Sequence, residues 1–318
     1  MTSYIIRRLL QALVTLFIVS LLIFLGMRFL PGDPILMYMG QDTITHMSIE
    51  QVEAIRHQFG LDKPLVSQYV SWIYGVIQGD FGVSIAYREP VIDLMLKRLP
   101  ISIHLGFLTL IIFNLIGIPA GVICAIRRGG WLDTVITILA NLGITVPVFW
   151  LGILMIYLFG LYLNWLPIYG YTSPFTDFWL STRQIIMPLI CLCVLPIAST
   201  ARQARSSMLE VMHQDYIRTA WSKGLRERVI IMRHAMKNGL IPVVTLTGLG
   251  IANVIAGAVL VETVFNIPGF GRLAVTSVLN QDYPIVQGVV LIVSTVVVLT
   301  NLAVDLSYGW LDPRVQYR

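Results

Sequence analysis

Residues that commonly carry chemistry are sparse in this chain, and their spacing assembles no reaction centre. Cys191 and Cys193 are two residues apart, so on a helix their side chains point about 200° apart and cannot ligate one metal ion together. No lysine follows a glycine, as a phosphate loop of the form G-x-x-x-x-G-K-S/T requires. We therefore predict no catalytic residue, no metal site and no cofactor bound by this chain. The histidines, which show no ligand spacing, are His46, His57, His104, His213 and His234.

Basic side chains gather in the stretch from Arg202 to Pro242. A helix can run through Ala220, and Gly224 is placed to end it in the left-handed conformation. A second helix then continues until Pro242. The small residues Ala220 and Gly224 permit close approach of another protein, so the two helices predict a rigid docking knob. The alternative is a generic basic loop that only sets membrane topology. The side chains that offer charge complementarity are Arg218, Lys223 and Arg226.

The composition requires a membrane setting for these elements. The chain has 318 residues, of which 56% are hydrophobic and 12% are charged, whereas soluble domains carry about 25% charged residues. So few charges cannot cover a soluble surface of this size, and the apolar residues must also face lipid. The net charge of +5 indicates Lys and Arg held at one membrane face rather than nucleic-acid binding.

Six apolar segments predict six transmembrane helices, since a span needs roughly 17 to 25 residues. The third segment is too long for a straight crossing and holds Gly143 and Pro147, which predict a kink or a strong tilt. The fourth segment is short and carries Pro188 and Pro196. The six segments are Leu9–Met27, Ile101–Ile126, Thr134–Leu163, Ile185–Ala201, Leu240–Val261 and Ile285–Val304.

The distribution of Lys and Arg predicts that both termini are cytoplasmic. With this orientation most of the 22 Lys and Arg residues lie in inside segments, as the positive-inside rule requires. The first apolar segment exceeds the core of a signal peptide and is followed by no cleavage site, so we expect a retained helix. The chain is thus predicted to be a multi-pass protein of the plasma (inner) membrane.

The long outer loop after the first segment predicts a small folded subdomain, because structureless loops of this length are rare. Ser48 and Gln51 form a capping-box pattern ahead of one amphipathic helix. A second amphipathic helix is indicated by Leu65, Tyr69, Trp72, Ile73 and Val76. The alternative is a pair of membrane-hugging helices with no partner.

The predicted spans hold almost no ionisable side chains, which argues against gradient-driven transport. No Asp, Glu, Lys or Arg occurs from Thr134 to Thr176, whereas proton- or ion-coupled carriers usually place charged groups inside the bundle. We interpret His104, which lies within a span, as a packing residue. Because the chain also lacks a phosphate loop, an energised function needs a partner protein.

The segment Glu262–Tyr283 combines helix-breaking Asn, Pro and Gly residues with large apolar side chains. We predict that it packs back into the mouth of the helix bundle and contributes to an outer gate, with Glu262 and Arg272 facing water or a partner. The alternative is a packing element with no gating role. The predicted gate residues are Glu262, Phe265, Phe270 and Arg272.

Short motifs occur along the whole chain in an order that resembles one transporter family. The stretch from Arg202 to Pro242 resembles the EAA loop of ABC importer permeases, with Arg218 in place of the first acidic residue of the general motif. The form is typical of the B-type subunit in the dipeptide/oligopeptide/nickel branch of binding-protein-dependent permeases. The other matching motifs are Tyr4–Leu10, Pro31–Pro34, Gly60–Pro64, Gly79–Ser84, Glu262–Leu273, Gln281–Gly288 and Asp312–Arg314.

The resemblance implies an all-α polytopic membrane protein with six transmembrane helices and a small extracytoplasmic helical subdomain after the first. We expect a cytoplasmic tip and first helix over 1–30, the subdomain over 31–100, and a core permease domain over 101–308. That domain contains the coupling loop 207–240, and a cytoplasmic tail follows over 309–318. The coupling helix is implied to dock on an ATPase subunit through Asp215, Tyr216, Arg218, Thr219, Ala220, Lys223 and Gly224.

The resemblance also implies a set of partners. They are a homologous second permease that forms a heterodimer with this chain, two ATPase subunits that bind ATP and Mg²⁺, an extracytoplasmic solute-binding protein and membrane lipid. The leading substrate is a di- or oligopeptide, although nickel, glutathione and oligosaccharide importers share this scaffold. Two alternatives from other classes are a gradient-driven secondary transporter and a non-transporting membrane scaffold.

Overall fold

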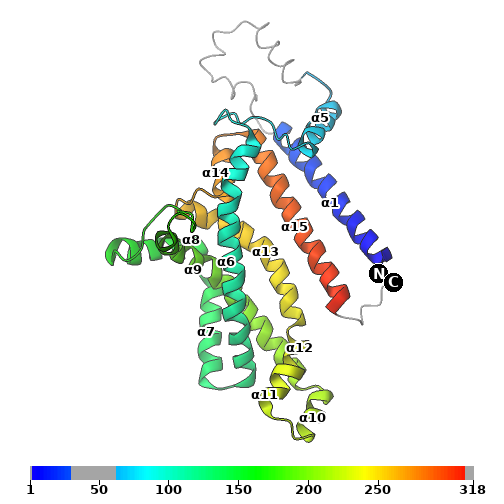
Figure 1. The fold of residues 1–318 in the computed structure, drawn as a ribbon, viewed down its shortest axis with the longest axis vertical. Helices are drawn as coiled ribbons and strands as arrows, with labels where there is room; N and C mark the ends of the chain where they lie inside the picture. Colours follow the sequence, from blue (N-terminus) through cyan, green and yellow to red (C-terminus); the bar gives the residue numbers. More distant parts are fainter. Residues whose placement is uncertain (1, 30–61, 312–318) are drawn as a thin grey trace. The chain divides into compact units, whose positions relative to one another are not determined.

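A computed structural model describes residues 2–29 and 62–311, and regular structure in that part is helical (Figure 1). The exception there is one isolated antiparallel bridge between Val83 and Pro90. The all-helical prediction is therefore confirmed for these residues. The helices are α1 Thr2–Phe29, α5 Leu65–Ile77, α6 Val91–Ile126, α7 Trp131–Thr145, α8 Val148–Met155, η1 Ile156–Tyr162, α9 Phe178–Met212, α10 Asp215–Ser222, α11 Glu227–Val229, η2 Ile230–Ala235, α12 Met236–Gly239, α13 Ile241–Val264, α14 Phe270–Leu279 and α15 Tyr283–Leu311.

Four helices of the described residues are long and apolar enough to cross a membrane, namely α1, α6, α9 and α15. The bent pair formed by α7 and α8–η1 raises this number to five if it counts as one span. Helix α13 covers the fifth predicted segment with 24 residues. The membrane-spanning character is confirmed, and the number of six spans stays a prediction.

The third predicted segment is broken at Pro147. The helix that follows α7 is bent away from it by 101°. Proline disfavours helical dihedral angles in the residue before it, and Val146 is extended, with φ −76° and ψ 122°. Gly143 has another role, because a Cβ atom there would lie 2.9 Å from the Val194 side chain of α9. Gly143 therefore permits helix packing, whereas Pro147 causes the bend.

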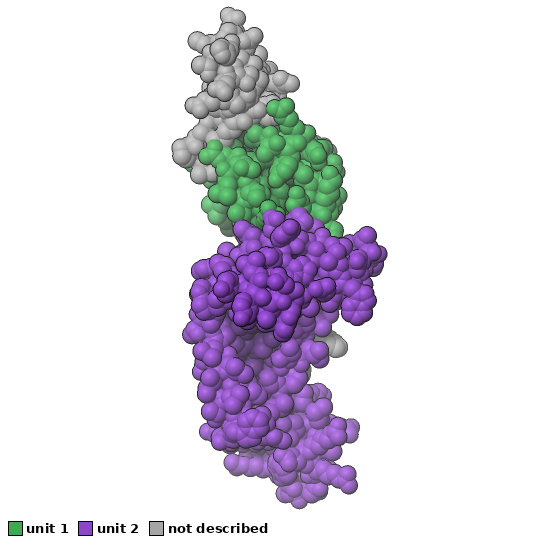
Figure 2. Space-filling view, turned by 90° about the vertical axis from the view of Figure 1, so that its left-hand side faces the viewer, with its two compact units in different colours: residues 1–100, 269–302 green, residues 101–268, 303–318 purple. Residues whose placement is uncertain are grey.

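The chain forms two compact units, coloured separately in Figure 2. Unit 1 comprises residues 1–100 and 269–302, and unit 2 comprises residues 101–268 and 303–318. Each unit has a buried apolar core of its own. The domain limits expected from the sequence stay predictions.

Within unit 1, aromatic contacts hold α5 against α1. The Tyr69 ring lies edge-on to Phe24 with centroids 5.5 Å apart, and its hydroxyl is 2.8 Å from Ser20 Oγ. The Trp72 and Phe24 ring centroids are 5.9 Å apart. Helix α5 confirms the second amphipathic helix of the outer loop. The first, expected after Ser48, lies outside the described residues.

Within unit 2, small residues bring α6 and α9 into backbone contact. A Cβ atom on Gly121 would lie 2.3 Å from the Ala201 carbonyl oxygen and 2.6 Å from Ala204 Cβ. Small side chains at such crossings allow helices to approach closely in a membrane. Beside this crossing lies a buried apolar group that we call the Met208 cluster. Its members are Val122, Ala125, Met208, Ile217, Ala220, Ile230, Ile231 and Ala235.

The segment between α13 and α15 is more regular than the sequence predicts, because α14 occupies ten of its residues. Phe270 and Leu273 lie three residues apart on that helix and are both buried, so one apolar face stabilises it. The helix-breaking residues lie before α14, where Asn266 takes a φ of 52°. Phe265, Ile267 and Phe270 are buried, and the packing of this segment into the mouth of the bundle stays a prediction.

Candidate coupling site

The basic stretch after α9 folds into a short helix, α10, separated from α9 by a two-residue break. Helix α9 ends at Met212, and Gln214 is extended, with φ −73° and ψ 149°. The prediction of one helix running through Ala220 is therefore wrong. The break lets α10 turn Ile217 and Ala220 onto the Met208 cluster, which burial of apolar surface favours.

Helix α10 has one buried and one exposed face. Ile217 is 0% exposed and Ala220 is 6% exposed. The sequence predicted that Ala220 allows close approach of another protein. Instead, Ala220 packs inside this chain, so that prediction is wrong. The exposed face also includes Trp221, which is not among the predicted coupling residues. The other predicted coupling residues, all exposed, are Asp215, Tyr216, Arg218, Thr219, Lys223 and Gly224.

Gly224 ends α10 in the left-handed conformation that the sequence predicts, with a φ of 70°. Its N–H donates to the Trp221 carbonyl at 2.9 Å, and the Leu225 N–H donates to the Ala220 carbonyl at 3.4 Å. These two bonds form the Schellman pattern, which satisfies carbonyls left free at a helix end. A Cβ atom on Gly224 would meet nothing within 4 Å, so the backbone conformation alone restricts the residue type.

The helical run α11–η2–α12 holds α10 in place and confirms the predicted second helix. Its Ile230 and Ala235 are fully buried in the Met208 cluster. The Asn238 side-chain N–H donates to the Tyr216 hydroxyl at 3.0 Å. The ion pair between Asp215 and Arg218, at 3.6 Å, is largely exposed and contributes little. Apolar packing therefore positions α10.

An ion pair with a buried carboxylate and a partly exposed guanidinium joins α7 to α9 about two turns before α9 ends. Arg205 donates from Nε and Nη2 to the two carboxylate oxygens of Asp133, at 2.7 and 2.9 Å. Asp133 is 5% exposed and also accepts the Gly129 N–H at 3.0 Å. Two-point Arg–carboxylate contacts are among the strongest hydrogen bonds in proteins. This pair fixes the first turn of α7 to the helix that leads into α10.

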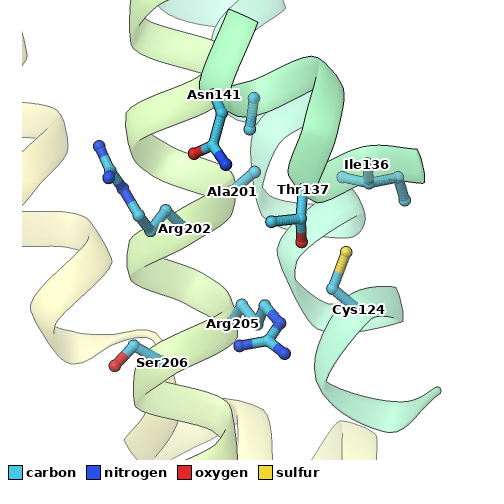
Figure 3. A pocket seen from close by; sticks show the side chains of 9 residues that line it. Cys124, Ile136, Thr137, Asn141, Ala201, Arg202, Arg205 and Ser206 are labelled. Atoms are coloured by element: carbon cyan, nitrogen blue, oxygen red, sulfur yellow. The ribbon is translucent and has the colours of Figure 1, made fainter. Parts of the chain in front are cut away.

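A small open cavity of about 240 Å³ lies beside this ion pair, between α6, α7 and α9. Figure 3 shows the Arg205 side chain extending from α9 toward α6 and α7. The cavity contains none of the predicted coupling or gate residues. It is lined by Cys124, Ile136, Thr137, Ala140, Asn141, Ala201, Arg202, Arg205 and Ser206.

The predicted gate residues belong to different compact units: Glu262 and Phe265 to unit 2, and Phe270 and Arg272 to unit 1. Glu262 is 0% exposed, so the prediction that it faces water is wrong. The hydroxyl of Ser102 on α6 donates to its carboxylate, which reduces the cost of burying that group.

His104, on α6, contacts the loop after η1. Its Nδ1 lies 2.9 Å from the Tyr171 hydroxyl, and the two rings meet edge-on with centroids 5.9 Å apart. This contact agrees with the packing role expected for His104. Burial raises the pKa of the Tyr171 phenol, so this hydroxyl keeps its proton and remains a hydrogen-bonding group.

The family comparison decides what kind of chain carries this site. Residues 117–317 match the family described as the binding-protein-dependent transport system inner membrane component. Residues 1–106 match the N-terminal family of the same membrane components. The chain belongs to this family. This permease is therefore a multi-pass membrane component of a binding-protein-dependent transport system, and α10 lies within its matched region.

Relatives align with the permease over its full length. A "Probable peptide ABC transporter permease protein" of Sinorhizobium fredii is 41% identical over 317 residues, covering 100% of both chains. The "Dipeptide transport system permease protein DppB" of Escherichia coli is 38% identical over 341 residues, again covering 100% of both. An inward-facing structure of the MetNI methionine ABC transporter covers 69% of the permease and 96% of its own chain, with a TM-score of 0.58 and 15% identity. That last likeness shows the fold.

Sequence reasoning missed the polar pairs that join distant parts of the permease. Asp133 and Arg205 are 72 residues apart, and Ser84 and Asp282 are 198 residues apart. The available signal for Asp133 was an acidic residue in the first turn of an apolar helix, where a carboxylate is favourable. No spacing rule connects it to Arg205.

Proposed function

We propose that the permease forms the translocation path of an ATP-driven importer of di- and oligopeptides, and that α10 couples this path to ATPase subunits. The observation that carries the proposal is the geometry of α10, which presents an exposed face, is held by the Met208 cluster and ends at a left-handed glycine. Such a helix can transmit a displacement without deforming, because its inner face is closely packed. The names of the full-length relatives support a peptide as the substrate.

In this proposal the chain supplies no catalytic residue, and two partner ATPase subunits bind ATP and Mg²⁺. A homologous second permease completes the path as a heterodimer, and an extracytoplasmic solute-binding protein delivers the peptide. ATP binding that favours one state of the complex would shift its access from one side to the other. The coupling face comprises Asp215, Tyr216, Arg218, Thr219, Lys223 and Gly224, with Trp221 added to it.

Uptake by the purified complex tests the substrate. We expect vesicles that contain both permeases, the ATPase subunits and the binding protein to accumulate a labelled dipeptide when ATP is supplied. Unlabelled oligopeptide should compete, whereas nickel, glutathione and oligosaccharide should not. Uptake that continues without ATP and stops when ion gradients are dissipated would instead identify a secondary transporter. No uptake either with or without ATP would favour a non-transporting scaffold.

The topology that we propose places both termini in the cytoplasm and residues 31–100 outside, with α13 completing six spans. Ser67 on α5 and Ser222 on α10 are both exposed, and the native cysteines are buried. A membrane-impermeant thiol reagent should label Ser67→Cys in intact cells and Ser222→Cys only after lysis. The reverse labelling pattern would show that the orientation is inverted.

We also retain the outer gate as a proposal for Glu262, Phe265, Phe270 and Arg272. The support is burial of three of these side chains in a segment that lies between two apolar helices. We expect Phe270→Ala to let ATP hydrolysis run without peptide uptake, whereas Leu279→Ala, at an exposed site of the same helix, should not. Normal coupling in Phe270→Ala would make the segment a packing element.

A further inference from the structure

The loop of residues 82–90, before α6, is closed on itself by its own backbone. The Ser84 N–H donates to the Glu89 carbonyl at 2.9 Å, and the Arg88 N–H donates to the Ser84 carbonyl at 3.1 Å. Val83 and Pro90 form an antiparallel bridge. The Tyr87 N–H donates to Ser84 Oγ at 2.9 Å. Ser84 is therefore the centre of a compact hairpin.

A carboxylate from a distant part of the sequence anchors this hairpin. Asp282 lies between α14 and α15, and its Oδ2 accepts the Ser84 hydroxyl at 2.5 Å and the Ala86 N–H at 3.0 Å. Ser84 and Asp282 are both 0% exposed. The other oxygen, Oδ1, is buried without a hydrogen-bond partner among the described residues. In Figure 1 this cyan loop lies beside the orange α14 of the same unit.

The tip of the hairpin carries an exposed tyrosine and an exposed arginine. Tyr87 is 40% exposed, and Arg88 is exposed with a φ of 56°. Neither side chain makes a hydrogen bond or an ion pair within the described residues. A non-glycine residue in the left-handed region is strained, and so is a buried carboxylate oxygen without a donor.

Two unfavourable features thus hold a tip whose Tyr87 and Arg88 side chains make no hydrogen bond or ion pair in the part of the chain that the structure describes. Such local strain is characteristic of segments that are ordered in advance for a partner. An exposed tyrosine beside an exposed arginine is also the residue combination enriched at the energetic centres of protein interfaces.

We propose that the 82–90 loop is a preorganised docking site for the solute-binding protein, with Tyr87 and Arg88 as its contact residues and an acidic, partly apolar patch as the surface they meet. This inference rests on the proposed function, which places residues 31–100 on the outer side and makes the binding protein the partner there. A rigid tip loses little conformational entropy on binding, so a small contact can be specific.

Stimulation of ATP hydrolysis by the binding protein tests the contact. Arg88→Asn removes the guanidinium, and asparagine tolerates the left-handed conformation. We expect it to raise the binding-protein concentration needed for half-maximal stimulation by about tenfold, the usual effect of losing one good interface contact. The control Arg128→Asn makes the same charge change at an exposed site of the α6–α7 turn and should match the wild type.

The response of the wild-type complex to the binding protein distinguishes failure of the proposed function from failure of the proposed docking site. If the binding protein does not stimulate it, the proposed function is wrong. If it is stimulated and Arg88→Asn responds at the same concentration, the docking site alone is wrong.

A crosslink identifies the occupant directly. The native cysteines of this chain are buried, so a photoreactive thiol reagent will attach to Arg88→Cys in preference to them. A product containing the binding protein supports the proposal, and its yield should rise with binding-protein concentration until the site is saturated. A product containing the second permease, or none with the binding protein, would overturn it.

Discussion

Two buried aspartates hold distant segments of the permease together, and their carboxylates accept hydrogen bonds from different kinds of donor. Asp133 in unit 2 meets the guanidinium of Arg205 at two points. Asp282 in unit 1 meets a hydroxyl and a backbone N–H, which are both neutral donors. An aspartate side chain is therefore one partner of an ion pair at position 133, whereas at position 282 it accepts hydrogen bonds from neutral donors alone.

This contrast shows which property of each aspartate the fold requires. At Asp133 the charge matters, because removal of the cation would leave an uncompensated charge in a buried site. At Asp282 the acceptor geometry matters, because its donors do not depend on its charge. Substitutions that remove charge but keep shape should therefore separate the two sites.

The largest effect is expected for Arg205→Ala. It leaves Asp133 buried without its cation, which costs about 3 kcal/mol or more of folding free energy. Thermal unfolding of the purified complex measures this as a lower midpoint. Arg202→Ala, an exposed site on the same helix, is the matched control. Equal midpoints for the two variants would show that the ion pair is not structural.

A substitution at Gly121 would disturb the backbone next to Arg205. A Cβ atom on Gly121 would lie 2.3 Å from the Ala201 carbonyl oxygen and 3.0 Å from Arg205 N. We expect Gly121→Ala to cost about 1–3 kcal/mol through overpacking and to be non-additive with Arg205→Ala in a double-mutant cycle. Gly26→Ala, where a Cβ atom meets nothing within 4 Å, should be neutral. Strict additivity would mean that the two sites act independently.

Gly224→Val tests whether peptide uptake depends on the way that α10 ends. The left-handed conformation strains a side chain with a Cβ atom by about 1 kcal/mol, and β-branching restricts it further. We expect normal membrane insertion with loss of peptide uptake. Gly224→Asn, which tolerates this conformation, should keep most of the uptake. Normal uptake by the valine variant would remove Gly224 from the coupling path.

The smallest effect is expected for Asp282→Asn. The amide oxygen can accept both bonds that Asp282 Oδ2 accepts, and the amide nitrogen takes the place of the oxygen without a partner. We therefore expect a change within about 1 kcal/mol. Asp133→Asn, which removes the charge that Arg205 requires, should cost clearly more in the same unfolding assay. Equal costs would abolish the distinction between the two sites.

Features set by one or two neighbouring residues were predictable from the sequence. Pro147 forces Val146 out of the helical region, and Gly224 takes the left-handed conformation because a helix must end there. The apolar segments gave the long helices for the same reason, since hydrophobic length is a local property. Helix α5 followed from its own periodicity.

Features set by contacts between distant segments were not predictable. Glu262 was expected to face water or the binding protein, but it is buried and accepts a hydrogen bond from the Ser102 hydroxyl. Ala220 was expected on the outer face because it is small, but the two-residue break before α10 turns it inward. Neither the direction of α10 nor the partner of a buried carboxylate is encoded in residue spacing.

The break at Pro147 has a consequence for the lipid around the permease. Helix α7 has 15 residues and is therefore roughly 22 Å long, whereas the hydrocarbon layer is about 30 Å thick. The helix beyond the break, turned by 101°, adds little height. A span shorter than the hydrocarbon layer is accommodated by local thinning of the bilayer, by snorkelling of flanking side chains or by association with another subunit. Membrane thickness is therefore a variable to control in reconstitution.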